Sequence, residues 1–262
     1  MFFHFRLLPL RLLGLTFLCV HFSMAWAQQD AIENTLVSTG LSKFKPPKII
    51  QISYQVTKNA KPFANVQEQF VLAGDIYKIQ SITKGIGIYA LLGESKLSST
   101  GDLTAQGLKP SHFELHQGDN AKKSLFTDFD WVTNTLHMQV KGKISDVALT
   151  AGTQDLASYA YQFMFLPAPL KDAVVVTLTT GKKLNQYSYK INADQEALTV
   201  VDSMGRSAQY KTLHLQLDQA KPQAESKELW LATDYYYLPV KIMMVDESGA
   251  KIEQTLTELH VE

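Results

Sequence analysis

A repeated alternation of apolar and polar residues constrains the fold of this chain more than any other feature. Residues 50–57 read Ile-Gln-Ile-Ser-Tyr-Gln-Val-Thr, so every second side chain is apolar. Because successive side chains of a β-strand point to opposite faces, this period predicts a strand with one buried and one solvated face. The same alternation returns at 136–140, 174–178, 187–191, 213–217 and 240–244. An antiparallel sheet is the natural interpretation.

Short polar segments separate the alternating runs and predict tight turns. They lie at 73–75, 117–120, 141–143 and 247–249, and each contains a glycine beside a polar residue. Such residues accept the backbone angles that hairpin turns require. We therefore expect a mainly β fold, in which a curved antiparallel sheet forms a barrel, a half-barrel or a sandwich.

One segment has the apolar spacing of a helix. We expect that helix over Thr153–Phe165, with Thr153 as its N-cap and with Pro167 and Pro169 preventing its continuation. Its apolar positions are Leu156, Tyr159, Ala160 and Phe163. A single helix with one apolar face in a β protein packs over the sheet or its open end, so this segment is predicted to be a plug or a lid.

The first 27 residues have the pattern of a secretory signal peptide. Arg6 and Arg11 accompany an apolar run over residues 7–20, and Ala25-Trp26-Ala27 forms a small-x-small cleavage motif. The run is interrupted by Arg11 and is shorter than the roughly 20 apolar residues of a membrane span. We expect cleavage after Ala27, a periplasmic location and no transmembrane span in the mature chain.

The predicted mature protein comprises a flexible polar leader at 28–47 and a single β-rich domain at 48–262. The only cysteine, Cys19, lies in the predicted signal peptide, so no disulfide or thiolate metal site is expected. Without Arg6 and Arg11, the chain keeps 23 basic against 25 acidic residues. This near-neutral balance lacks the basic stripe that nucleic-acid binding requires, so no nucleic-acid partner is expected.

One strand carries the clearest candidate chemistry. On a strand, His112, Glu114 and His116 would share one face, while Phe113 and Leu115 would face the core. The two histidines would stand about 13 Å apart along a straight strand, too far to share one metal ion. We therefore interpret this set as a solvated strand face and expect neither a metal site nor a cofactor.

Two acidic residues provide the other catalytic alternative. Asp128 and Asp130 flank Phe129 at strand spacing, and paired carboxylates can serve acid and base chemistry. The same spacing is typical of the exposed phase of a strand. A hydrolase or metal enzyme thus remains an alternative, but we expect a noncatalytic protein.

Several segments, in order, resemble a family of exported bacterial proteins known as domain of unknown function 3108. They are Ser98–Gly101, Gly107–Phe113, Gln154–Ser158 and the residues Trp230, Leu231, Asp234, Leu238–Lys241, Asp246 and Gly249. The resemblance covers most of the chain from Ile50 to the end. It implies a secreted β-rich domain, and it transfers no catalytic residue.

The closing segment is also similar, more distantly, to periplasmic lipoprotein carriers. The shared features are Trp230, Asp234 and Leu238-Pro239-Val240. That likeness implies a curved sheet around an acyl chain, with the helix at 153–165 as its lid. Phe163, Trp230 and Tyr235 would then be the residues that line an apolar ligand site.

These observations favour an exported, noncatalytic cell-envelope protein that binds an apolar or amphiphilic, lipid-like ligand. The alternative is a structural or partner-binding periplasmic module that contacts another envelope protein and takes no small molecule.

Overall fold

The computed structural model describes residues 45–118, 124–167, 170, 173–202, 204–218, 226–245 and 248–262, with only the backbone of 193–196. Residues Lys45–Glu262 form one compact unit. The predicted signal peptide at 1–27, with Cys19 and Ala27, lies outside the described residues, as does most of the predicted leader. Along the described ranges, no helix has the length and apolar character needed to cross a bilayer.

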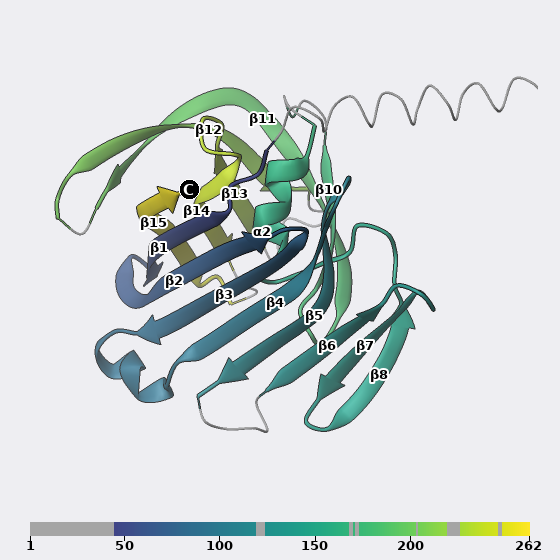
Figure 1. Ribbon diagram of the computed structural model, residues 1–262. Coiled ribbons are helices and arrows are strands. Elements are labelled where there is room, and N and C mark those ends of the chain that lie inside the picture. Colours follow the sequence, from purple (N-terminus) through teal and green to yellow (C-terminus); the bar gives the residue numbers. More distant parts are fainter. Residues whose placement is uncertain are drawn as a thin grey trace, which may run out of the picture. The chain divides into compact units, whose positions relative to one another are not determined.

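Within this part of the chain, 15 strands form one continuous sheet (Figure 1). The strands are β1 (Ile49–Lys58), β2 (Lys61–Ala73), β3 (Ile76–Gly85), β4 (Ser95–Thr104), β5 (Gly107–Gln117), β6 (Leu125–Asp130), β7 (Thr135–Val140), β8 (Lys143–Ala148), β9 (Gln154–Asp155), β10 (Val174–Thr179), β11 (Leu184–Val201), β12 (Ser207–Leu217), β13 (Ser226–Ala232), β14 (Leu238–Val245) and β15 (Lys251–Val261). The helical segments are η1 (Gly87–Leu92), α2 (Tyr159–Gln162) and η3 (Phe163–Phe165).

Two meanders meet where the first strand pairs with the last. The order across the sheet is β8 to β1, followed by β15 down to β9. Neighbouring strands are antiparallel, except that the short β9 runs parallel to β10. The predicted mainly β, antiparallel fold is therefore confirmed, and the six alternating segments fall within β1, β7, β10, β11, β12 and β14.

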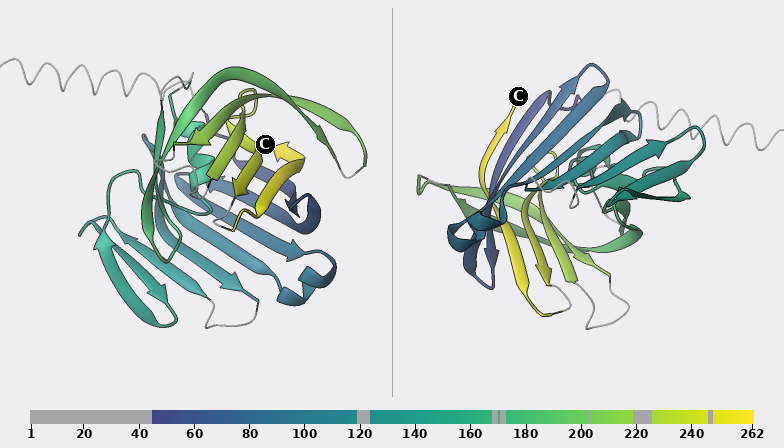
Figure 2. Two further views of the ribbon diagram at one scale, coloured as in Figure 1. Left: turned by 180° about the vertical axis from the view of Figure 1, so that it is seen from behind. Right: turned by 90° about the horizontal axis from the view of Figure 1, so that it is seen from below.

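The sheet is strongly curved (Figure 2). Its strand registers shift next to Tyr54 in the β1–β15 pair, at Gly101 in the β4–β5 pair and at Trp230 in the β13–β14 pair. Such bulges bend a strand and increase its twist. The curvature brings β9 back to β5, where the side chain of Gln154 donates a hydrogen bond to the carbonyl of Leu108 (2.8 Å). The result is a barrel-like half-closed sheet.

The alternation that predicts the strands also defines the inner face of this sheet. In β1, Ile50, Ile52, Tyr54 and Val56 are buried, whereas the residues between them are more exposed. One core cluster lies on the inner face of β10–β13 and includes the helical residues Tyr159 and Phe163. The strand members of this cluster are Val174, Leu178, Tyr189, Leu213, Leu215, Leu229 and Leu231.

The expected helix over Thr153–Phe165 is too long by six residues at its start. Gln154 and Asp155 instead form β9, paired with Leu178 and Thr179 of β10. The Asp155 carboxylate then accepts hydrogen bonds from the backbone N–H groups two and three residues ahead (2.8 and 2.9 Å). Aspartate side chains that bond the local backbone compete with helix formation. The helix therefore starts at Tyr159, and we call residues 154–165 the plug.

Candidate functional site

The plug is joined to the inner face by a buried chain of polar side chains. Ser99 of β4 donates a hydrogen bond to the Asp155 carboxylate (2.6 Å), and the Tyr77 hydroxyl lies 3.1 Å from the Ser99 hydroxyl. Both Ser99 and Asp155 are fully buried. Burial raises the pKa of Asp155 to about 6, against the opposing effect of its hydrogen bonds. This chain connects β3 and β4 to the start of the plug.

A second set of contacts anchors the plug to β5. The Gln162 side chain accepts a hydrogen bond from the Leu108 N–H (2.8 Å) and donates one to the Gln106 carbonyl (2.9 Å). Gly107 adopts a positive φ of 102°, and a Cβ there would lie 2.6 Å from the Gln162 amide and 2.8 Å from Phe165. Only glycine fits this approach without displacing the plug.

A carboxylate lies on the inner face beneath the plug. Glu68 of β2 stands between Val66 and Phe70 in the apolar phase of the strand, and it is half-buried. It accepts hydrogen bonds from Ser81 of β3 and from Tyr161 of α2 (both 3.2 Å). Burial raises the pKa of Glu68 to about 7, although both hydrogen bonds act in the opposite direction. An ionisable group that titrates near neutrality thus contacts the plug.

A cationic side chain faces the plug from the opposite meander. Lys227 of β13 pairs with Met244, and its ammonium lies 4.4 Å from the centroid of the Tyr159 ring. This distance fits a cation–π contact. Among the residues that the structure describes, no carboxylate lies within salt-bridge distance of Lys227. The inner face therefore carries both an acidic and a basic group beside the aromatic residues of α2.

Apolar side chains continue this surface around the plug. Several remain only partly buried although they pack against the core cluster: Val176, Tyr187, Ile191, Leu217 and Ile242. Met244 and Ile252, which pair at the end of β14 and β15, are also half-buried. The inner face is thus apolar, incompletely covered, and supplied with Glu68 and Lys227.

The three aromatic residues predicted to line a ligand site lie in different places. Phe163 is buried in the core cluster of the inner face. Trp230 lies on the outer face, because Leu229 and Leu231 on either side of it belong to that cluster. Its ring stacks on His214 at 4.3 Å between centroids, and the Lys241 ammonium lies 4.9 Å above it.

Tyr235 lies in the turn between β13 and β14, where its ring packs edge to face on Tyr210 (5.3 Å between centroids). The fold therefore does not bring Tyr235, Trp230 and Phe163 to one cavity. Their role in ligand binding stays a prediction, and Phe163 is the one of the three that lies on the inner face.

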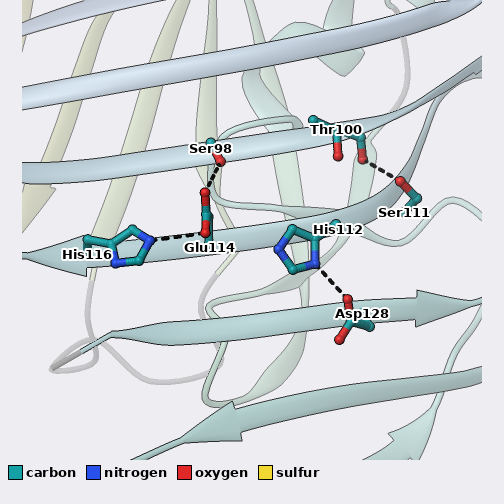
Figure 3. A network of polar contacts seen from close by, with 7 residues as sticks. All are labelled: Ser98, Thr100, Ser111, His112, Glu114, His116 and Asp128. Atoms are coloured by element: carbon teal, nitrogen blue, oxygen red, sulfur yellow. Dashed lines mark hydrogen bonds and ion pairs between the residues drawn. The ribbon is translucent and has the colours of Figure 1, made fainter. Parts of the chain in front are cut away.

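The histidines of β5, His112 and His116, belong to two separate pairs of side chains (Figure 3). His116 lies 3.0 Å from Glu114, which also accepts a hydrogen bond from Ser98 (2.9 Å). His112 turns instead to Asp128 of β6 (2.6 Å). The hydrogen bond from His116 holds the pKa of Glu114 below its ordinary value. The three side chains share a face, as predicted, but they do not converge on a common point.

Asp130 has a local structural role. Its carboxylate accepts hydrogen bonds from the N–H groups of Val132 and Thr133 (2.9 and 3.0 Å), which closes the turn between β6 and β7. These bonds lower the pKa of Asp130. Among the described residues, no group of three His, Cys, Asp or Glu side chains has a geometry that would hold a metal ion.

The outer face of β1, β2, β3 and β15 contains a polar groove of about 500 Å³. Its lining includes Gln51, Gln67, Gln69, Gln80, Glu258 and His260. Four glutamines lie in this lining, together with the aliphatic residues Ile52, Ile82 and Leu259. The groove is suited to hydrogen bonding with a polar partner.

Glu68 and Lys227 are absent from the sequence-based list of candidates. Each occupies the apolar phase of its strand, Glu68 between Val66 and Phe70 and Lys227 two residues before Leu229. A charged residue in that phase is the sequence signal that identifies them, since buried charges are rare unless paired. Glu68 contacts Tyr161, which lies 93 positions later, and Lys227 contacts Tyr159, which lies 68 positions earlier. Such contacts cannot be predicted from the local sequence.

Most of the chain matches a protein-family model. Residues 50–257 match the family described as "Protein of unknown function (DUF3108)". No curated protein matches. A solved structure, "Crystal Structure of Beta-barrel-like Protein of Domain of Unknown Function DUF1849 from Brucella abortus", is similar with a TM-score of 0.55 and 12% identity, covering 83% of this chain and 99% of that chain.

The structural likeness supports the barrel-like fold alone. The predicted resemblance to lipoprotein carriers stays a prediction. Three of the motifs that carry the family resemblance meet at the start of the plug. Ser99 donates a hydrogen bond to Asp155, and Gln154 donates one to the Leu108 carbonyl.

Proposed function

We propose that this protein, which belongs to the DUF3108 family of proteins of unknown function, is exported and has a noncatalytic role in the cell envelope. In this role, the inner face binds an apolar or amphiphilic, lipid-like ligand beside the plug. Export and a periplasmic location rest on the signal-peptide pattern of residues 1–27.

One observation carries the ligand proposal: partly buried apolar residues of the inner face surround a cationic side chain. Leu217, Ile242 and Met244 would contact a hydrocarbon chain, and Phe163 lies in the adjacent core cluster. Ligand sites are mostly apolar with a few placed polar groups. The Lys227 ammonium would pair with an anionic headgroup, which favours a fatty-acid-like ligand over a neutral one.

The plug is the element that such a ligand would displace or contact. It carries Tyr159 under Lys227 and Tyr161 against Glu68. Both contacts involve groups that a ligand headgroup can replace. The deeper anchor through Asp155 would hold the plug in place while α2 adjusts.

A titration with 11-(dansylamino)undecanoic acid tests this proposal, because its fluorescence rises when the probe enters an apolar site. Saturable binding is expected, and Lys227→Met should weaken it about tenfold through loss of one charge pair. Lys190→Met, an exposed lysine on the other face of β11, is the matched control. No saturable binding, or equal loss in both variants, would contradict the proposal.

The polar outer groove supports a second candidate, a partner-binding envelope module. A photo-crosslinking residue at Gln69, inside the groove, would then give one discrete protein adduct in cells. The same residue at Gln209, exposed on β12, is the control. Identical adduct patterns at both positions would count against this alternative.

A further inference from the structure

The segment η1 connects β3 and β4 at one end of the strands (Figure 1). Its large apolar side chains are exposed. Three side chains of η1 point into solvent: Ile88 is 77% exposed, Leu91 89% and Leu92 69%. No residue of η1 is buried. Isolated exposed apolar residues are common, but a contiguous set of large ones marks an interaction surface.

Contacts with β2 anchor this segment to the sheet. The Tyr89 ring packs on Phe63 of β2 with 4.6 Å between centroids, and the Ile86 N–H donates to the Phe63 carbonyl (2.9 Å). Gly85 allows the chain to turn back, because a Cβ there would overlap the Tyr89 carbonyl. With Tyr89 anchored inward, the three apolar side chains are directed away from the sheet.

Lysines gather along the same edge. The strand registers place four turns together there, since Lys58 pairs with Lys61, Thr83 with Ser95, Val140 with Lys143 and Val245 with Lys251. We call this end of the strands, with its turns, the lysine edge. Its lysines are Lys58, Lys61, Lys84, Lys96, Lys141, Lys143 and Lys251. Ile144, 67% exposed, adds a further apolar side chain beside Lys143.

The described acidic residues near this edge are already paired. Glu94 bridges Lys84 and Lys96 (2.9 and 3.5 Å), and Glu253 contacts Lys251 (3.2 Å) as well as Lys241. The opposite strand ends carry the acids Asp75, Asp102, Asp202, Asp234 and Glu262 beside the bases Lys48, Lys78, Lys109, Arg206 and Lys211. Among the described residues, four lysines of the lysine edge have no carboxylate within salt-bridge distance: Lys58, Lys61, Lys141 and Lys143. Their charge is available to an anionic partner beside η1.

We propose that the lysine edge docks on an anionic phospholipid bilayer, with Ile88, Leu91 and Leu92 inserted among the headgroups. Apolar insertion combined with basic residues around it is the physical basis of interfacial membrane binding. Lysines spread over four turns suit a planar charged surface better than the compact footprint of one protein partner. This docking goes beyond the ligand proposal and does not depend on it.

The test is vesicle flotation of the purified protein. The expected result is binding to phosphatidylcholine vesicles containing about 30 mol% phosphatidylglycerol, with little binding to pure phosphatidylcholine. High salt should release most of the protein, since salt screens exposed charges. Absence of binding to the anionic vesicles overturns the proposal, whatever the outcome of the fatty-acid titration.

Paired variants locate the contact. Leu91→Ser with Leu92→Ser, and separately Lys141→Glu with Lys143→Glu, should each reduce vesicle partitioning at least about tenfold. The controls are Ile76→Ser with Val132→Ser, which are 62% and 92% exposed at the opposite edge, and Lys48→Glu with Lys78→Glu. Both controls should bind as the parent protein does.

Three results would overturn the proposal. One is equal partitioning of the Leu91/Leu92 variant and the parent protein. Another is equal loss in the opposite-edge controls. The third is that the parent protein self-associates in mass photometry, that the Leu91/Leu92 variant does not, and that neither binds vesicles. The apolar surface would then contact a second copy of the protein.

Discussion

Replacing Glu68 by glutamine should stabilise the protein at pH 8 and remove part of its dependence on pH. The glutamine keeps the size of the side chain and an oxygen that can accept from Tyr161 or Ser81, but it carries no charge. Burial raises the pKa of Glu68 from 4.5 to about 7 in the folded protein. The folded state therefore holds this proton more tightly than the unfolded state does.

The sign and size of the predicted change in unfolding free energy follow from the difference between the folded and unfolded pKa of Glu68. Between pH 4.5 and 7, folding takes up a proton at Glu68, so the free energy of unfolding falls as pH rises through this window. At ~1.4 kcal/mol for each factor of ten, the difference between 4.5 and about 7 corresponds to about 3 kcal/mol. Glu68→Gln should show little change at pH 4.5 and a gain of about 1–3 kcal/mol at pH 8.

Urea unfolding at pH 4.5 and pH 8 measures both values. Asp155, whose pKa burial also raises, to about 6, contributes equally to both proteins, so the difference between them isolates Glu68. Asp75→Asn, an exposed acid in the turn between β2 and β3, is the control and should change neither value. If Glu68→Gln has the parent's pH dependence, or is less stable at pH 8, the reasoning fails.

Three further substitutions test the plug. Ser99→Ala removes a donor to the buried Asp155 and should cost about 1–3 kcal/mol in urea unfolding; an unchanged midpoint would contradict the anchor. Gly107→Ala should destabilise by more than 1 kcal/mol because its positive φ and its contact with Gln162 oppose a Cβ; Gly74→Ala, with positive φ but open space, should cost less. Phe163→Ala should cost about 3–5 kcal/mol through an internal cavity, whereas Val132→Ala, 92% exposed, should be neutral in thermal unfolding.

The strands were predictable because they depend on local alternation. The pattern from Ile50 to Val56 appears directly as β1, with its apolar residues buried. The turns at Gly74 and Gly142 likewise follow from residues that tolerate positive φ. These features need no knowledge of which strand lies beside which.

The plug was only partly predictable, since its start depends on a residue far away in the chain. The apolar spacing of Tyr159 and Phe163 correctly indicates a helical turn. What the spacing omits is the partner of Asp155, because Ser99 lies 56 positions earlier. Together with the pairing of Gln154 and Asp155 to Leu178 and Thr179, that hydrogen bond stabilises β9 where the local pattern favoured helix.

The candidate site was harder to predict from the sequence than the plug. His112, Glu114 and His116 attract attention as chemical groups, yet their partners are near neighbours such as Ser98 and Asp128. Glu68 and Lys227 lie in the apolar phases of strands from two different meanders. The curvature that brings both against α2 arises from the whole sheet and not from any local segment.

Native mass spectrometry with lipid extraction, on the full chain purified from its own cells, tests the central claim most directly. The account predicts a protein mass accompanied by a bound amphiphile with an anionic headgroup, and lower occupancy in Lys227→Met than in Lys190→Met. A bare protein mass, with no amphiphile in the extract from either the parent or the Lys190 variant, would contradict a ligand site on the inner face.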